Sequence, residues 1–226
     1  LYDGQTPTGL VAIGMVNPSK KVGDDQDAFS FKVEIPGMLT LLAKRSFEGF
    51  VPGINDLVFG NEKEGVTGVE EKIQRGKIAV ASLGDYKNAQ SAGDQLAASN
   101  ALTLFDQHRD FLGYGYLESA EQAVPPVALT FYAFRIMVGL GTFFILLFLV
   151  YMYLMEKKKL EDKPMVLKLG FISLFLAWIA SQAGWIVSEV GRQPWAIQDM
   201  LPVTIATSNL DSGSVAVTFF LFLFLF

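Results

Sequence analysis

Three long apolar runs without internal charge dominate the second half of the chain, whereas charged and polar residues are spread through the first half. The runs lie at residues 136–155, 169–188 and 214–226. About 20 apolar residues in a helix are needed to span the hydrocarbon core of a bilayer. The pattern therefore predicts two complete transmembrane helices and a truncated third one, at residues 126–155, 169–189 and 214–226.

An alternative origin for these runs is a set of buried core helices in a large soluble protein. Such helices carry polar residues at helical spacing, whereas these runs are apolar on all sides. The length of the runs also favours membrane spans. We therefore interpret the second half of the chain as membrane-embedded.

The connection between the two complete spans sets their orientation. Residues 156–168 carry five lysines. Lysine-rich loops between spans stay on the cytoplasmic side. We therefore expect a multi-pass protein of the bacterial inner (cytoplasmic) membrane, with residues 1–125 and 190–213 in the periplasm, where these two segments can meet.

The first half of the chain predicts loops and short helices. Residues 35–50 could form an amphipathic helix, with Pro36 suited to its first turn. Residues 64–84 and 89–112 have helical composition, and glycines and prolines punctuate the remainder. The expected fold class is thus an all-α integral membrane protein with a long, loop-rich periplasmic region.

Composition divides the chain in the same way. Residues 1–125 hold 17 acidic and 11 basic side chains, whereas residues 126–226 hold 6 and 7. The acidic balance and the lack of a basic stripe argue against nucleic acid as a partner. The absence of cysteine excludes disulfides, thiolate metal sites and cysteine nucleophiles. Because the chain begins with Leu1 and ends inside an apolar run, we expect a fragment of a longer protein.

Two polar groups and a methionine near the outer ends of the spans are candidates for chemistry. They are Arg135, Met137 and Glu189, and a charge within a bilayer is costly unless it is paired or functional. A thioether and a carboxylate can both serve as axial ligands of haem iron, and arginines such as Arg135 and Arg192 can pair with haem propionates.

Simpler roles are open for each of these residues. Methionine in a transmembrane helix is usually a packing residue. The two arginines could be interfacial anchors, and Glu189 could form a surface ion pair with Arg192 at i,i+3 spacing. The sole histidine, His108, lies in an acidic stretch and is expected to be solvated. One histidine cannot form a two-histidine haem site, and no phosphate loop or nucleophile triad is present.

Several segments resemble subunit I of the cytochrome bd quinol oxidases. GRQPW at 191–195, preceded by Glu189, is similar to one signature of that family, and FYAFRIMVGLG at 131–141 is similar to a second. Residues 31–57 and LGYGYL at 112–117 resemble the long periplasmic quinol-binding loop. The stretch from 60 to 110 resembles the insertion of the long-loop subfamily.

The resemblance implies specific roles for five residues. Met137 corresponds to an axial ligand of low-spin haem b, with Arg135 beside it. Glu189 corresponds to the axial ligand of high-spin haem b. Trp185 corresponds to a tryptophan between haems, and Arg192 to an arginine near the haem propionates. The ligand of haem d and the quinol-contacting lysine and glutamate would lie outside the chain, the latter two just before Leu1.

The resemblance also implies an activity for the whole complex. The family oxidises quinol at the outer face, passes electrons through low-spin haem b, high-spin haem b and haem d, and reduces dioxygen to water. It generates a proton motive force without pumping, together with a subunit II and possible small accessory subunits. The fragment alone is not expected to be active. Two rival readings are a quinol-binding haem b membrane anchor and a non-haem membrane transporter or scaffold.

Overall fold

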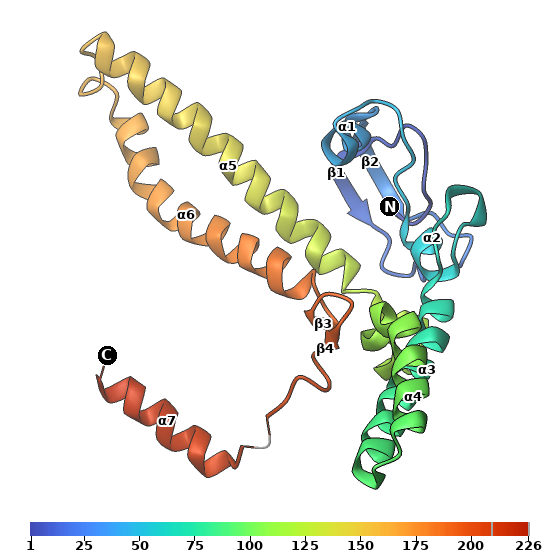
Figure 1. The fold of residues 1–226 in the computed structure, drawn as a ribbon. Helices are drawn as coiled ribbons and strands as arrows, with labels where there is room; N and C mark the ends of the chain where they lie inside the picture. Colours follow the sequence, from blue (N-terminus) through green and yellow to red (C-terminus); the bar gives the residue numbers. More distant parts are fainter. Residues whose placement is uncertain (209, 226) are drawn as a thin grey trace.

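A pair of long helices and the part formed by residues 1–125 make up most of the fold. We call residues 1–125 the outer module. The structure is a computed structural model that describes residues 1–208 and 210–225. Figure 1 shows the two long helices, α5 and α6, side by side, with the first 125 residues gathered near the beginning of α5. Asn209 and Phe226 lie outside the described residues, so the expected segments 190–213 and 214–226 are described without them.

The helix pair comprises α5 (Val127–Glu156) and α6 (Pro164–Val190). Both are long and apolar enough to cross a membrane. Only 11% and 0% of their most apolar windows are buried within the described residues, as expected of helices that face a bilayer. Helix α6 begins earlier than the expected residue 169, because Pro164 suits a first helical turn. The lysine-rich connection lies at the far end of the pair from the outer module (Figure 1).

Glycines on α6 let the two helices approach each other. Gly170, Gly184 and Gly191 recur at multiples of seven residues and therefore share one face of the helix. A Cβ at these positions would meet Tyr151, Met137 and Thr130 of α5, respectively, at 2.0, 3.1 and 3.1 Å. Small residues at such contacts are typical of packed membrane helices. The Tyr151 hydroxyl also donates a hydrogen bond to the Val166 carbonyl at 2.7 Å, near the lysine-rich end.

The outer module begins with a β-hairpin that the sequence analysis did not predict. Strands β1 (Leu10–Val16) and β2 (Phe29–Ile35) pair antiparallel, with Met15 opposite Phe31. The sequence of β2, FSFKVEI, alternates apolar and polar residues with the period of a strand. The expected helix over 35–50 is correspondingly short, since α1 runs only from Met38 to Lys44.

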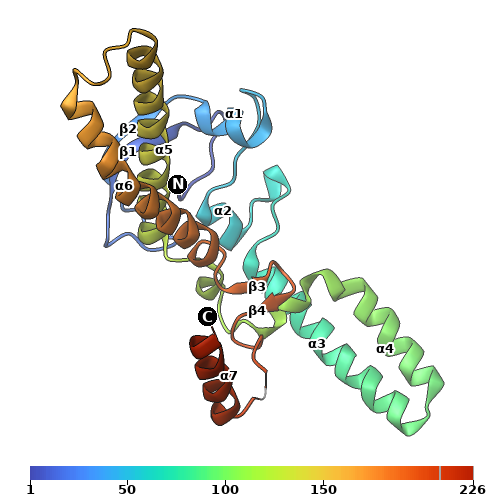
Figure 2. The same cartoon turned by 90° about the vertical axis from the view of Figure 1, so that its left-hand side faces the viewer.

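Two helices project from the outer module as an antiparallel arm (Figure 2). Helix α3 (Val69–Ala92) continues through the break expected after residue 84, and α4 (Gln95–His108) follows a turn at Gly93. Gly93 adopts a φ of 77°, which glycine tolerates without strain. The expectation of short helices was therefore wrong for α3, which is 24 residues long.

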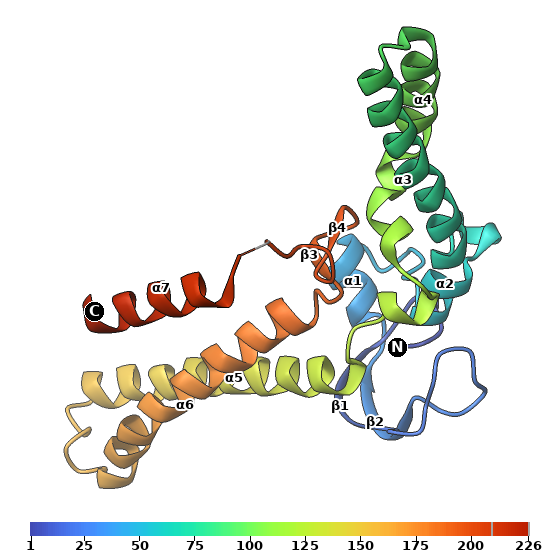
Figure 3. The same cartoon turned by 90° about the horizontal axis from the view of Figure 1, so that it is seen from below.

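Shorter elements complete the outer module and the segment after α6. Before α3 lie α2 (Ile54–Phe59) and the 3₁₀ turn η1 (Glu62–Glu64). After α4 lie the 3₁₀ segments η2 (Arg109–Tyr116) and η3 (Ala120–Ala123). After α6 come β3 (Trp195–Ile197), β4 (Leu201–Pro202) and α7 (Ser212–Leu225). Figure 3 shows α7 running apart from the α5–α6 pair.

The base of the arm depends on a close backbone crossing between α3 and η2. A Cβ on Gly76 would lie 2.3 Å from the backbone nitrogen of Gly115, and a Cβ on Gly115 would lie 2.4 Å from the Gly76 carbonyl oxygen. Backbone atoms cannot yield as a flexible side chain can. Both positions therefore require glycine.

A matched pair of substitutions on α3 tests this crossing. We expect Gly76→Ala to destabilise the outer module by about 1–3 kcal/mol, the usual cost of overpacking. Gly84→Ala meets nothing within 4 Å and should stabilise the same helix by up to about 1 kcal/mol, because alanine has the higher helix propensity. Hydrogen exchange of α3 amides in the full-length complex measures both effects. Equal exchange in the two variants would contradict the close crossing.

Candidate functional site

Met137 lies in the contact between α5 and α6. Its side chain is half-buried, and Gly184 of α6 faces it closely enough that a Cβ there would lie 3.1 Å from the Met137 sulfur. Any side chain at position 184 would compete with the thioether for this space. The Met137 sulfur thus occupies the space that a side chain at position 184 would take.

Trp185 and Glu189 occupy a different face of α6. Their spacing of four residues puts them one turn apart on a single side of the helix. The Trp185 side chain is 63% exposed, and the Glu189 side chain is half-exposed. Glu189 lies five residues beyond Gly184 and hence about 140° around the helix axis. Met137 and Glu189 therefore belong to separate faces of the helix pair.

Glu189 forms the ion pair with Arg192 that its spacing allows. The Arg192 Nη2 atom donates to Glu189 Oε1 at 2.9 Å, just beyond the end of α6. Both side chains are more than two-fifths exposed. Exposed ion pairs contribute only about 0–1 kcal/mol to stability, so this contact orients the carboxylate more than it stabilises the fold.

Arg135 points toward the β-hairpin and is incompletely satisfied. Its guanidinium donates to the Val11 carbonyl at 2.7 Å and to the Phe131 carbonyl at 3.2 Å. The guanidinium carbon lies 3.3 Å from the centre of the Phe131 ring. Within the part of the chain that the structure describes, the buried Nε atom has no hydrogen-bond partner. This donor is free for an additional acceptor.

The β-hairpin rests on the beginning of α5. The Val16 amide donates to the Tyr132 hydroxyl at 2.9 Å, one turn from the bond between Arg135 and Val11. A cavity of about 350 Å³ lies between the hairpin and α5, and it has mainly apolar walls and one guanidinium. A second cavity of about 490 Å³ shares Val11, Phe134 and Arg135 with the first. Arg135 is the charged group of both cavities.

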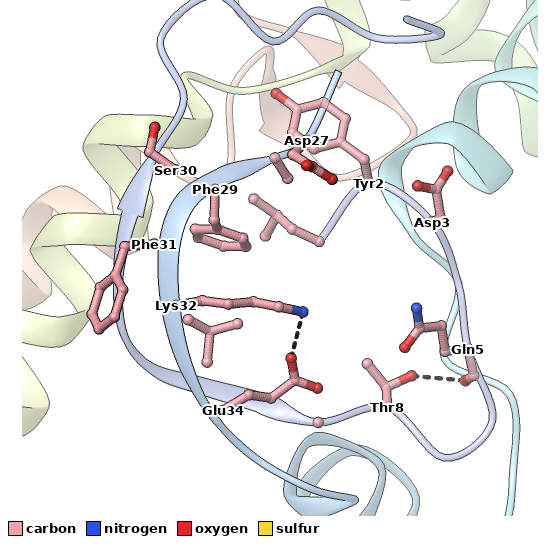
Figure 4. Close-up of a pocket in the computed structure, with 14 residues that line it drawn as sticks. Tyr2, Asp3, Gln5, Thr8, Asp27, Phe29, Ser30, Phe31, Lys32 and Glu34 are labelled. Carbon is pink, nitrogen blue, oxygen red and sulfur yellow. Dashed lines mark hydrogen bonds and ion pairs between the residues drawn. The ribbon is translucent and has the colours of Figure 1, made fainter. Parts of the chain in front are cut away.

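A more polar cavity lies between the hairpin and the N-terminal segment. Figure 4 shows Lys32 and Glu34 projecting into it from β2, with a 2.6 Å ion pair between them. Its volume is about 380 Å³, and Tyr2 and Asp3 of the N-terminal segment line its other wall. Phe31, Lys32 and Glu34 in its lining belong to the segment 31–57 that resembles the quinol-binding loop, but none of the candidate haem-site residues lines it.

His108 is not the solvated side chain that the sequence predicted. It ends α4 in a half-buried position, and its Nδ1 atom is buried without a hydrogen-bond partner among residues 1–208 and 210–225. Over those same ranges, no cluster of three or more histidine, aspartate or glutamate residues could hold a metal ion. Any metal held by the described residues would need ligands of another kind, or ligands from elsewhere.

The segment after α6 meets the outer module, as the sequence indicated for residues 1–125 and 190–213, but the residues that form this junction were not predicted. Trp195 is 5% exposed and lies in one hydrophobic cluster with Val69, Ile73, Tyr114 and Leu117. The Tyr114 and Trp195 rings meet edge to face, with centroids 4.8 Å apart. Both residues come from motifs that the sequence analysis quoted, GRQPW and LGYGYL, and this was the available signal.

A hydrogen bond reinforces the junction. The Tyr114 hydroxyl donates to Asp199 Oδ1 at 2.5 Å. Burial raises the pKa of Tyr114 above its ordinary value, and the neighbouring Asp199 carboxylate raises it further. The tyrosine therefore stays protonated and remains a hydrogen-bond donor throughout the neutral pH range.

Comparison with known proteins gives consistent matches. A family model described as cytochrome bd terminal oxidase subunit I matches residues 1–226. The chain is 33% identical to cytochrome bd-II ubiquinol oxidase subunit 1 of Escherichia coli (strain K12) over 209 residues, 85% of this chain and 38% of that protein. It is 39% identical to cytochrome bd ubiquinol oxidase subunit 1 of Bacillus subtilis (strain 168) over 93 residues, 41% of this chain and 20% of that protein. The chain thus spans well under half the length of these relatives.

The hydrogen bond that docks the hairpin can be tested directly. We expect Tyr132→Phe to speed exchange of the β1 amides by about 2- to 10-fold, because one hydrogen bond contributes about 0.5–1.5 kcal/mol. Tyr153→Phe, which removes an exposed hydroxyl from the same helix, is the matched control. Hydrogen exchange of a peptide covering β1 in the full-length complex provides the measurement. Unchanged exchange in Tyr132→Phe would show that the hairpin does not rest on α5 through this bond.

Proposed function

The chain belongs to the family of cytochrome bd terminal oxidase subunit I, and we propose that it is part of a respiratory quinol:oxygen oxidoreductase. The complex would oxidise quinol at the periplasmic face of the bacterial inner membrane and reduce dioxygen to water. It would contain a subunit II and possible small accessory subunits. Since the chain spans 38% of its E. coli relative, the complete activity belongs to the longer protein.

The placement of Met137 supports this proposal most strongly. A thioether serves haem iron as a soft axial ligand. Here the sulfur lies in the contact between α5 and α6, packed against Gly184. The arginine two residues earlier has a free buried donor, which suits a haem propionate. The residues present therefore fit a low-spin haem b at this level of α5.

The face of α6 that carries Trp185 and Glu189 fits a second haem. The carboxylate is half-exposed on this chain, and its cationic partner Arg192 lies 2.9 Å away. In the proposed complex, Glu189 would hold high-spin haem b, Arg192 would pair with propionates, and Trp185 would lie between haems. The haems, including a haem d held by residues outside the chain, would supply the electron path and the oxygen-reducing centre.

The cavities beside Arg135 support quinol oxidation at the outer face. A quinol has an apolar ring and tail with two polar hydroxyls, and the walls between the hairpin and α5 offer mainly apolar surface with one guanidinium. Protons released here would enter the periplasm, while oxygen reduction would take protons from the cytoplasm. This arrangement generates a membrane potential without a proton pump.

A reduced-minus-oxidised visible spectrum of the full-length protein with its partner subunit is the primary test. Bands of both haem b and haem d are expected. Haem b without haem d would favour a quinol-binding membrane anchor, and a folded complex without haem would favour a transporter or scaffold. Either result would overturn the proposed oxidase.

Substitution of Met137 tests the low-spin ligand. We expect Met137→Leu to shift or abolish the low-spin haem b signal and to lower quinol oxidation by more than about tenfold, because even outer-shell partners of metal ligands commonly contribute 10- to 100-fold. Met152→Leu is the control, since that residue is exposed on the same helix. Spectra and oxygen consumption with quinol are measured for both. A normal spectrum and rate in Met137→Leu would remove the ligand assignment.

Substitution of Glu189 tests the second ligand independently. Glu189→Ala should perturb high-spin haem b and leave the low-spin band largely intact, because the two candidate ligands lie on separate faces. Glu156→Ala removes a carboxylate at the opposite end of the helix pair and serves as the control. Selective loss of the low-spin band in Glu189→Ala would show that the two assignments must be exchanged.

A further inference from the structure

We propose that the Tyr114–Asp199–Trp195 junction positions Glu189 and Arg192 from outside the membrane. The outer module would hold the segment after α6 in place, and that segment would orient the carboxylate toward high-spin haem b. The inference rests on the proposed function, because it takes Glu189 as the haem ligand. Tyr114 and Asp199 are positioning residues in this scheme, since neither lies on the helix face that carries Glu189.

Two contacts hold the segment after α6 against the outer module. Trp195 enters the hydrophobic cluster at the base of α3, and the turn after β3 presents Asp199 to the Tyr114 hydroxyl. Gly113 packs directly on this turn, where a Cβ would lie 2.4 Å from the Asp199 carbonyl oxygen. Asp199 has a φ of 62°, a left-handed conformation that is uncommon outside glycine but that aspartate adopts more often than most residues. The turn is therefore held by contacts rather than by local preference alone.

Hydrogen bonds constrain the segment between the junction and Glu189. The Trp195 amide donates to the Arg192 carbonyl at 3.0 Å, and the Gln193 amide donates to the Val190 carbonyl at 3.2 Å. The Gln193 side-chain amide donates a hydrogen bond to the Glu189 carbonyl at 3.3 Å. On the far side, the Val203 amide donates to the Pro194 carbonyl at 2.7 Å. Consecutive turns thus transmit the position of Trp195 back to the last turn of α6.

Glu189 has few contacts of its own to fix its orientation. Its carboxylate is half-exposed, and the ion pair it makes is with Arg192, which belongs to the same segment. An exposed ion pair is a weak constraint. Metal ligands depend on outer-shell partners for their orientation. In this chain such support can reach Glu189 and Arg192 through the segment that the junction holds.

The test uses the purified full-length complex and two small substitutions. Tyr114→Phe removes one hydroxyl, and Asp199→Ala removes its acceptor. Each should weaken retention of high-spin haem b by about tenfold, the low end for outer-shell partners, and should shift the midpoint potential of this haem while low-spin haem b stays unchanged. The double variant should resemble Asp199→Ala alone, because the Tyr114–Asp199 bond is lost in both single variants, whereas Asp199→Ala also removes the acceptor of Gln198 Nε2 at 3.1 Å.

The matched control is Tyr116→Phe in the same LGYGYL motif. Tyr116 is 38% exposed, so loss of its hydroxyl should change neither haem. Normal high-spin haem b in both Tyr114→Phe and Asp199→Ala would overturn the inference. Parallel loss of both haems would also overturn it, since that result indicates a general structural role. A parent complex without high-spin haem b would instead overturn the proposed function on which the inference rests.

Discussion

The bilayer is the constraint on α5 and α6, because a lipid-exposed helix must make all its backbone hydrogen bonds internally. Helices α5 and α6 meet this requirement with uncharged runs, so their charged groups gather toward the ends. Lysines occupy one end, and Arg135, Glu189 and Arg192 occupy the other. The same constraint makes close helix contact dependent on small residues, and hence on the glycines of α6. The orientation proposed for the pair rests on this separation of charges.

The membrane helices were the most predictable part of the fold, because their signal is an uninterrupted run within a single stretch of sequence. The β-hairpin was missed although β2 alternates apolar and polar residues regularly. Its apolar residues Phe31 and Val33 remain exposed on this chain. Its partner β1 is separated from it by a 12-residue connection, which is longer than a typical hairpin turn. The continuity of α3 was missed because the helical composition was divided into two segments, 64–84 and 89–112, whereas α3 runs through Gly84. A glycine inside a helix lowers stability without ending it.

The candidate site could be predicted as residues but not as contacts. Met137 was found because a thioether can bind haem iron, and Glu189 because a charge within a membrane is energetically costly. The Glu189–Arg192 ion pair was found from its i,i+3 spacing. The partner of Arg135 is a backbone carbonyl 124 positions away, which no local pattern encodes. The junction of Tyr114 with Asp199, 85 positions apart, was hidden for the same reason. Contacts between residues so far apart in sequence depend on how all the elements pack together, which local sequence patterns do not specify.

The junction also sets an order on folding. The core at the base of α3 is built from residues 69–117 together with Trp195, which follows both membrane spans in the chain. The outer half therefore cannot complete this core until α5 and α6 have been made and α6 has returned the chain to the outer side. Contacts between residues so distant in sequence form late, because chain closure costs entropy before any contact is gained. The same contacts that complete the outer core thus also hold the turn after α6, so the position of this turn depends on the outer module.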